Sequence, residues 1–269
     1  MYNVGRLPNQ GRRGPEFAAP WPIGHAMVNN SPVVSPAGQD TVTVKRLRRG
    51  VGFIAVALPP VVLFGNMLFE WKWVLLGSIS GSYYTHMRGV FSGSLCAIGV
   101  FLIAYRYQAL DDKWSTRAGI LAIIVALVPT TPDRSTGAVS RLQVWAGGVH
   151  FVAAASLFAV LAYFCLYIFT HSRDSDTKTP QKNVRTLIYL CTGGLIVAAI
   201  LAALLIAVAV PRSVRDSWNT LFWCETAAVL SFAVAWLTKG GAFRRLNDPP
   251  RAPAAPPQQP RPGDLPVRP

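Results

Sequence analysis

The stretch WAGGVHFVAAASLFAVLAYFCLYIFT, residues 145–170, decides the fold class of this chain. Apart from His150 it contains no acidic or basic residue. It exceeds the roughly 20 apolar residues that cross a bilayer as an α-helix, and it is too uniformly apolar for an amphipathic helix of a soluble domain. Residues 145–170 therefore predict a membrane-spanning helix.

Further apolar blocks along the chain predict further spans. Two of them, residues 186–210 and 221–237, are as clear as the first. The Pro59-Pro60 pair removes backbone donors from the middle of another block and predicts a kink there. The block that begins near Ala118 is the weakest, because its apolar run is shorter than a full crossing. We expect an all-α, polytopic transmembrane six-helix bundle, with approximate spans Val51–Phe69, Gly89–Tyr105, Ala118–Pro129, Trp145–Thr170, Thr186–Val210 and Leu221–Leu237.

Composition supports membrane embedding and argues against nucleic-acid binding. The 269 residues are 51% hydrophobic and 14% charged, whereas roughly a quarter of the residues in soluble domains are charged. The net charge of +14 would suit a nucleic acid, but the basic residues lie in the tails and between apolar blocks. We therefore expect the lipid bilayer as a partner and no nucleic acid.

The two ends of the chain predict disordered tails around one transmembrane domain. Residues 1–48 are rich in Pro, Gly and Asn and end in a basic cluster, and residues 241–269 are rich in proline. Such compositions favour disordered chain. The predicted organisation is a disordered basic cytoplasmic arm at 1–48, a six-span domain at 49–240 and a disordered cytoplasmic tail at 241–269, with no cleavable signal peptide.

Basic residues also predict the orientation. With six spans and the N-terminus inside, about 20 of the 26 Lys and Arg residues lie on the cytoplasmic side, as the positive-inside rule requires. If the third block did not cross, the same residues would divide almost evenly between the two sides. We therefore expect a multi-pass protein of the plasma (inner) membrane with both termini in the cytoplasm.

An ionisable group inside a span is costly and requires an explanation. His150 and Glu225 each lie about five residues inside a predicted span, so both sit ~8 Å below the outer surface at ~1.5 Å per residue. One interpretation is a His–Glu pair facing a cavity, which could relay a proton, bind a metal or hold a polar headgroup. The other is an interhelical hydrogen bond that serves packing alone.

The segment SISGSYYTHMR, residues 78–88, connects the first two predicted spans on the same outer side. Its hydroxyls and its cation could join the two intramembrane groups in a site open to the outer leaflet. The alternative is a solvated loop, with its tyrosines anchored at the membrane interface. The candidate ligand-binding residues are Ser80, Tyr84, Arg88, His150 and Glu225, of which His150 and Glu225 are also the candidate catalytic residues.

Sequence motifs for well-marked chemistries are absent. There is no H-E-x-x-H or H-x-x-x-H pattern, no G-x-S-x-G elbow, and no Walker or G-x-G-x-x-G motif. The four cysteines lie inside apolar blocks and show no C-x-x-C spacing. We therefore expect no metal and no cofactor, and an enzyme is the less favoured interpretation.

Four segments carry a resemblance to a known family: GSISGSYYTHMRGVFSGSLCAIGVFLIAYR, VALVPTTP, VHFVAAASLFAVLAYFCLYIFT and FWCETAAVLSFAVAWLTKG. Over about residues 50–240 the chain resembles a bacterial family of small six-helix integral membrane proteins classed as a domain of unknown function. The resemblance implies one six-span domain in the inner membrane without an assigned activity. The residues that match the polar positions of that family are Ser80, Arg88, Asp111, His150 and Glu225.

The chain is more distantly similar to the seven-helix superfamily of alkaline ceramidases and progestin/adipoQ-type receptors. Sites in that superfamily use a Ser, an Asp and three His around zinc. This sequence departs from the pattern, because it has no H-x-x-x-H on a late helix and one predicted helix fewer.

Three functions follow as hypotheses. The first, which we favour, is a non-enzymatic membrane protein whose outer-leaflet polar pocket binds or senses a lipid or small solute. The second is a membrane-embedded, metal-dependent hydrolase of lipid amides or esters, with His150 and Glu225 as general base and orienting carboxylate or as metal ligands. The third is a small-solute transporter, which needs polar groups near the midplane, whereas the predicted span centres are apolar.

Overall fold

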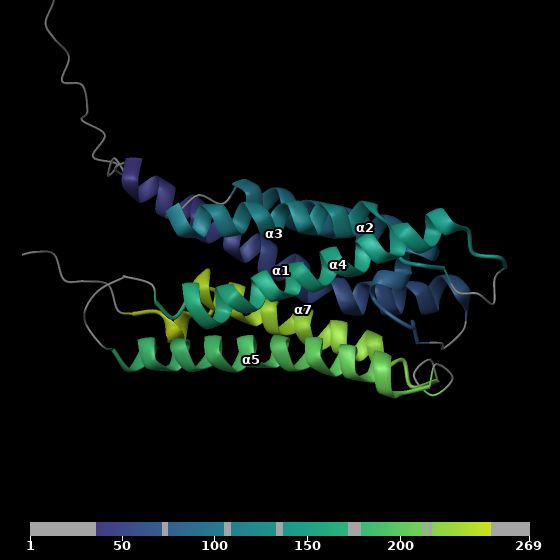
Figure 1. Cartoon of the computed structure of the whole chain (residues 1–269). Helices are drawn as coiled ribbons and strands as arrows, with labels where there is room; N and C mark the ends of the chain where they lie inside the picture. The colour runs from purple at the N-terminus through teal and green to yellow at the C-terminus, as the bar shows by residue number, and fades with distance from the viewer. Residues whose placement is uncertain are drawn as a thin grey trace, which may run out of the picture. The chain divides into compact units, whose positions relative to one another are not determined.

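The computed structural model describes residues 36–71, 75–104, 109–132, 137–171, 179–211, 214 and 217–248, so most of the predicted arm and tail lies outside the described residues. All regular elements in these ranges are helical, which confirms the predicted all-α class for this part of the chain. The long helices are α1 (Pro36–Glu70), α2 (Arg88–Ala104), α3 (Ala109–Leu127), α4 (Arg141–Tyr163), α5 (Pro180–Ala209) and α7 (Thr220–Lys239) (Figure 1). The short elements are the 3-10 helices η1 (Ser80–Tyr84) and η4 (Arg244–Leu246) and the π-helix η3 (Phe164–Ile168), which continues α4.

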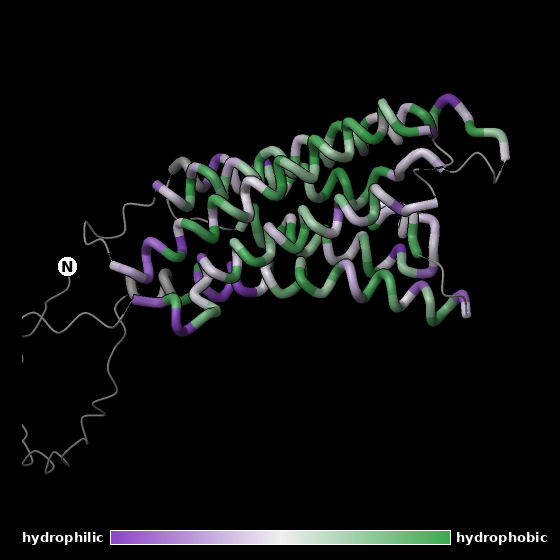
Figure 2. The backbone as a smooth tube through the Cα atoms, turned by 90° about the horizontal axis from the view of Figure 1, so that it is seen from below, coloured by the Kyte–Doolittle hydropathy of each residue, from purple (hydrophilic) through white to green (hydrophobic). Residues whose placement is uncertain are grey.

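In the described residues, four helices are long and apolar enough to cross a membrane, namely Val42–Glu70, Arg141–Ile168, Pro180–Ile206 and Thr220–Lys239. Helix α2 is apolar but has only 17 residues. Helix α3 has 19 residues and carries charged residues in its first half, and it is not among the four. Hydrophobic residues dominate the middle of the helices and hydrophilic residues gather near their ends (Figure 2). That α2 and α3 also cross the membrane remains a prediction.

The long helices of the described chain pack side by side in a closed ring. Each helix contacts the next in the order α1, α2, α3, α4, α5, α7, and α7 contacts α1 again. Helices α4 and α7 also touch each other across the ring, but only slightly. A ring of this kind leaves a central space that side chains have to fill. Large side chains that fill it with less than 2% exposure are Phe91, Leu102, Phe164, Phe222 and Trp236.

Two glycines allow α2 and α3 to approach closely. A methyl group placed on Gly99 would lie 2.8 Å from the carbonyl oxygen of Gly119, and one placed on Gly119 would lie 2.5 Å from the carbonyl oxygen of Gly99. Backbone atoms cannot rotate away as a side chain can. Small residues at such a crossing are typical of paired membrane helices.

Helix α1 begins at Pro36, well before the predicted start of the first span near Val51. Residues 36–48, which the composition assigns to the disordered arm, are therefore helical. Proline is well tolerated at the first position of a helix, because the N–H it lacks would have no helical partner there. The helix then runs unbroken through Pro59-Pro60.

Arginines in the early part of α1 explain why the helix extends beyond the apolar block. Arg49 donates from Nε to the carbonyl of Gly240 and from Nη2 to the carbonyl of Gly241, each at 2.9 Å. The buried Arg48 donates to the carbonyl of Lys239 at 3.4 Å. Carbonyl groups at the end of a helix have no partner within it, and these guanidinium groups satisfy those of α7. The basic cluster is thus part of the fold.

The segment after α7 is tied to the start of α5. Arg185 donates to the carboxylate of Asp248 at 2.8 Å and to the carbonyl of Leu246, and the hydroxyl of Thr179 donates to Asp248 at 2.6 Å. The hydrogen bond from Arg185, followed by that from Thr179, lowers the pKa of Asp248.

We expect this tie to loosen in acid. Because the pKa of Asp248 is lower in the folded chain, its contribution is present above the unfolded value of about 4 and is lost as the pH falls through the folded value. Both side chains are partly exposed, so the loss is less than about 1 kcal/mol and local. Amide-exchange protection of residues 244–248 should fall on acidification, and Asp248→Asn should lower it at neutral pH. Unchanged protection in that variant would contradict the assignment.

Candidate functional site

Glu225, in the second turn of α7, holds the connector between α1 and α2, residues 71–87. Its Oε2 accepts hydrogen bonds from the backbone N–H groups of Ile79 at 2.6 Å and Ser80 at 3.1 Å, and its Oε1 accepts one from the Ser80 hydroxyl at 3.0 Å. The backbone N–H of Phe222 also donates to the carbonyl of Gly77. Of the candidate residues, Ser80 and Glu225 are therefore in direct contact.

The sequence of the connector explains why it packs against the helices. Leu76, Ile79 and Met87 bury apolar side chains, and Ser82 is fully buried. The hydroxyl of Ser78 accepts a hydrogen bond from the backbone of the residue three positions later, at 2.8 Å, and so stabilises the start of η1. In its described part the connector is packed structure, in contrast to the solvated loop that the sequence left open.

His150 bonds to the segment after α3, and no hydrogen bond joins it to Glu225. It is 4% exposed, and its Nδ1 lies 2.7 Å from the carbonyl oxygen of Val128. Because a carbonyl only accepts, Nδ1 carries the proton, and in the neutral ring Nε2 is then an acceptor. Nε2 is buried and has no hydrogen-bond partner. The sequence left open whether His150 and Glu225 pair; in the structure the two residues bond different elements.

Tyr84 reaches the same segment after α3. Its hydroxyl donates to the carbonyl of Thr130, two residues beyond the partner of His150. Burial raises the pKa of Tyr84, with Tyr83 acting in the same direction and Arg88 opposing it. A glycine in α4 permits the close packing of this segment, because a methyl group on Gly147 would overlap the loop before α4.

Arg88 and His86 lie at the surface with partners of their own. The guanidinium of Arg88 stacks over the ring of Tyr83, 4.1 Å from its centroid, and donates to its hydroxyl. His86 lies 3.4 Å from the carboxylate of Glu70 and stacks on Phe69. Neither residue contacts Glu225 or His150, so the structure does not gather all five candidate residues around one point.

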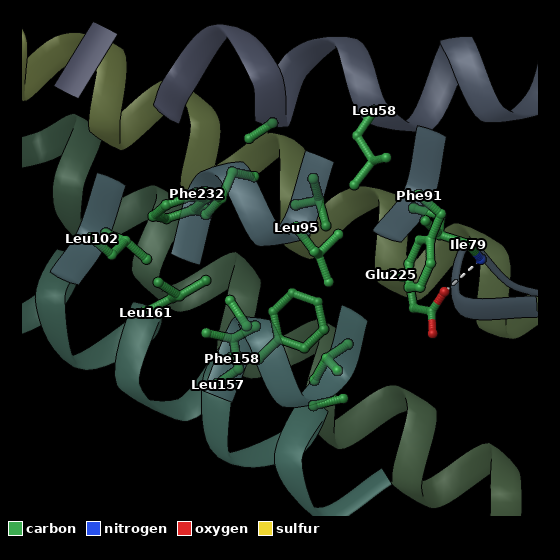
Figure 3. Close-up of a pocket in the computed structure, with 16 residues that line it drawn as sticks. Leu58, Ile79, Phe91, Leu95, Leu102, Leu157, Phe158, Leu161, Glu225 and Phe232 are labelled. Carbon is green, nitrogen blue, oxygen red and sulfur yellow. Dashed lines mark hydrogen bonds between the residues drawn. The ribbon is translucent and has the colours of Figure 1, made fainter. Parts of the chain in front are cut away.

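An apolar cavity lies inside the ring of helices, with Glu225 at one end (Figure 3). Its volume is about 60 Å³. Helices α1, α2, α3, α4 and α7 contribute its walls, and every lining residue except Glu225 is apolar. It lies in the part of the ring where α4 and α7 touch only slightly. The side chains around it include Leu58, Ile79, Phe91, Leu95, Leu157, Phe158 and Phe232.

Buried polar atoms without partners occur at the same end of the bundle as Glu225, which we call the connector end. They include Ser82 Oγ in η1, Thr226 Oγ1 next to Glu225, and His150 Nε2. His150 lies one turn from Ala154, a lining residue on the same face of α4. A buried polar atom costs free energy unless water or a ligand satisfies it. The connector end therefore keeps hydrogen-bonding capacity that the described residues do not use.

In the described part of the chain, no group of three or more His, Cys, Asp or Glu side chains lies together as metal ligands would. The four cysteines there are free thiols. Asp111 lies in α3, but its side chain is outside the described residues. The arrangement thus offers hydrogen-bonding groups at one end of an apolar space, and the metal-dependent hypothesis gains no ligand set from it.

Comparisons with known proteins found no matching family model, no matching curated protein and no matching solved structure. The resemblance over residues 50–240 therefore stays a prediction.

Sequence reasoning selected Ser80, His150 and Glu225 but missed the groups that bond to them. These are the backbone amides of Ile79 and Ser80 and the carbonyl of Val128. Every residue carries these backbone groups, so the sequence does not indicate which of them bond to a given side chain. The one available signal was Ser78, because serine side chains commonly stabilise turns such as the one that begins η1.

Proposed function

We propose that this chain is a multi-pass protein of the inner membrane whose six helices enclose a binding site for the hydrocarbon chain of an amphiphile. The observation that carries the proposal is the apolar cavity that Glu225 lines at one end, with its carboxylate oxygens bonded to the connector (Figure 3). Ligand pockets commonly have this composition, with apolar walls and a few polar groups that fix orientation.

Six crossings, with both termini in the cytoplasm and the connector end toward the outer leaflet, agree with the packing of the helices. At ~1.5 Å per residue, the 17 residues of α2 extend about 26 Å, close to the ~30 Å hydrocarbon core, whereas the apolar part of α3 that begins at Ala118 extends about 15 Å. Both helices belong to the same closed ring as the four long apolar ones. The charged first half of α3 then lies at the cytoplasmic side, where charge is tolerated.

We infer that the headgroup lies beyond the apolar walls of the cavity, at the connector end, and that it donates hydrogen bonds. Glu225 lines the cavity there, and His150 Nε2, which lies outside the lining, is an acceptor without a donor among the described residues. The hydroxyls of Ser82 and Thr226 can act as either donor or acceptor. A hydroxyl or amino headgroup therefore fits this end, whereas a carboxylate headgroup would face Glu225.

The cavity is too small for a hydrocarbon chain as it stands, so it has to widen when the ligand binds. At about 60 Å³ it is less than half of the roughly 150 Å³ that accommodates benzene in a protein core. Helices α4 and α7 touch only slightly. We therefore expect the side chains between these two helices to move apart when the ligand binds.

A hydrolase is the second candidate, and one observation favours it. His150 has Nδ1 fixed by a carbonyl and Nε2 unpartnered, which is how a general base is oriented. Among the described residues no serine or cysteine bonds to Nε2, so the nucleophile of such an enzyme has no assigned residue. A transporter draws no support from a cavity whose walls are apolar.

The proposal is tested with a photoreactive long-chain alcohol that carries a diazirine on its chain. We expect it to label residues that line the cavity in the detergent-purified full chain. Ala55→Leu should lower that labelling roughly tenfold, because the larger side chain fills space in the cavity that the hydrocarbon chain would occupy. Ala55 lines the cavity at 1% exposure.

The matched control is Ala57→Leu, the same substitution two residues along α1 at an exposed position. It should leave the labelling unchanged, and both variants should keep the wild-type melting temperature to within a few degrees. A fatty acid of the same chain length should compete less well than the alcohol. Equal labelling in the two variants, or labels confined to exposed faces of the helices, would contradict the proposal.

A further inference from the structure

A strongly basic surface lies at the opposite end of the bundle from the connector. It is formed by Lys45 and Arg46 of α1 and by Arg244 and Arg245 of η4, all with exposed side chains. We call these four residues the basic surface. Within the described chain none of their side chains has a hydrogen bond or an ion pair, so their charges are not used by the fold.

The backbone beneath the basic surface is held in place by other helices. Arg49 donates to the carbonyls of Gly240 and Gly241 and so fixes α1 to the turn that follows α7. Gly241 adopts a positive φ of 66°, and Asn247 Nδ2 donates to its carbonyl at 3.2 Å. Arg185 of α5 donates to the carbonyl of Leu246. Hydrogen bonds from α1 and α5 therefore fix the position of the turn that carries the cations of η4.

Helix periodicity brings the two halves of the surface to the same turn. Lys45 and Arg46 lie four and three residues before Arg49, so all three share one face of α1. Arg49 bonds to the turn between α7 and η4, so this face of α1 borders that turn. The two pairs of cations thus lie on either side of the turn, at the same end of the bundle.

The charges around this junction leave it positive. Arg48 and Arg49 already satisfy the carbonyl end of α7, where the helix dipole is negative. Asp248, an acidic residue of the same region, is bound by Arg185. The four residues of the basic surface are then available to an external anion.

We propose that the basic surface binds the phosphate headgroup of an anionic phospholipid in the cytoplasmic leaflet. Its cations lie within six residues of the end of an apolar span, at the level where headgroups meet the helices. Basic residues beside a span attract anionic lipids. This proposal uses the same membrane orientation as the proposed function, but it does not depend on the cavity or its ligand.

The test is titration of the detergent-purified full chain with phosphatidylglycerol and, separately, with phosphatidylcholine of identical acyl chains. We expect phosphatidylglycerol to bind at least about tenfold more tightly, with an affinity that falls as salt is raised. Arg244→Gln/Arg245→Gln and Lys45→Gln/Arg46→Gln should each lower this preference several-fold, and the four substitutions together should abolish it.

Arg141→Gln is the matched control, because Arg141 is an exposed cation at the connector end, at the start of α4. It should leave the preference unchanged. Equal affinity for the two lipids, retention of the preference in the fourfold variant, or equal loss in Arg141→Gln would overturn the proposal. Full competition by inorganic phosphate would also overturn it, because it would assign the surface to a soluble anion.

Discussion

Glu225→Leu should destabilise the connector end of the bundle by about 3 kcal/mol or more. The backbone amides of Ile79 and Ser80 and the hydroxyl of Ser80 would lose their acceptor, and each buried unsatisfied group costs about 1–3 kcal/mol. The packing of the connector depends on these bonds, so its amides should also lose exchange protection. Thermal unfolding in detergent and amide exchange over residues 75–87 would measure the two effects.

Glu225→Gln separates hydrogen bonding from charge. Both backbone amides bond to the same carboxylate oxygen, and the single oxygen of a glutamine can accept both, while its amide can donate to the hydroxyl of Ser80. We therefore expect stability close to wild type. Thr226→Val, at the adjacent residue, removes a buried hydroxyl without a partner and should be neutral or slightly stabilising. If Gln destabilised the protein as much as Leu, the hydrogen-bonding role of Glu225 would be wrong.

Gly119→Ala should lower the free energy of unfolding by about 1–3 kcal/mol, and Gly119→Leu by more. The new Cβ would lie 2.5 Å from the backbone oxygen of Gly99, so α2 and α3 would have to move apart. Gly99→Ala should have a similar effect, because its Cβ would meet the Gly119 carbonyl at 2.8 Å.

Gly93→Ala, on α2 like Gly99, is a control for which we expect a change in stability of the opposite sign. A methyl group on Gly93 meets nothing within 4 Å, and alanine favours a helix over glycine by roughly 0.5–1 kcal/mol. We expect this variant to be slightly more stable than wild type in thermal unfolding. A loss of stability equal to that of Gly119→Ala would mean that these helices tolerate no alanine at glycine positions in general, and that the α2–α3 crossing is not the cause.

The helices were predictable where composition alone decides. Residues 145–170, 186–210 and 221–237 are apolar over the length of a span, and the structure has long helices there. The weak third block is a helix whose charged first half lowers its mean hydropathy, and only its packing between α2 and α4 shows its place in the ring. The extension of α1 was missed, because its cause is hydrogen bonding to the distant end of α7.

The depth of His150 and Glu225 in the predicted spans could be derived from the sequence, but the partners of their side chains could not. Spacing from the ends of the spans placed His150 and Glu225 at one end of the bundle, where both lie. It did not predict that they would bond to different elements, because the rotation of a helix about its axis depends on its neighbours. The cavity was also beyond the sequence, since it arises from the way several helix faces meet.

The central claim is that the chain crosses the membrane six times, so that the connector end and the basic surface lie on opposite sides. Single cysteines at exposed positions in a cysteine-free background test it: Ala138→Cys before α4, and Lys113→Cys and Asn183→Cys at the other end. In intact cells, a membrane-impermeant maleimide should label Ala138→Cys alone, and all three should react after the membrane is permeabilised. Labelling of Lys113→Cys or Asn183→Cys in intact cells, or protection of Ala138→Cys there, would contradict the six-span account.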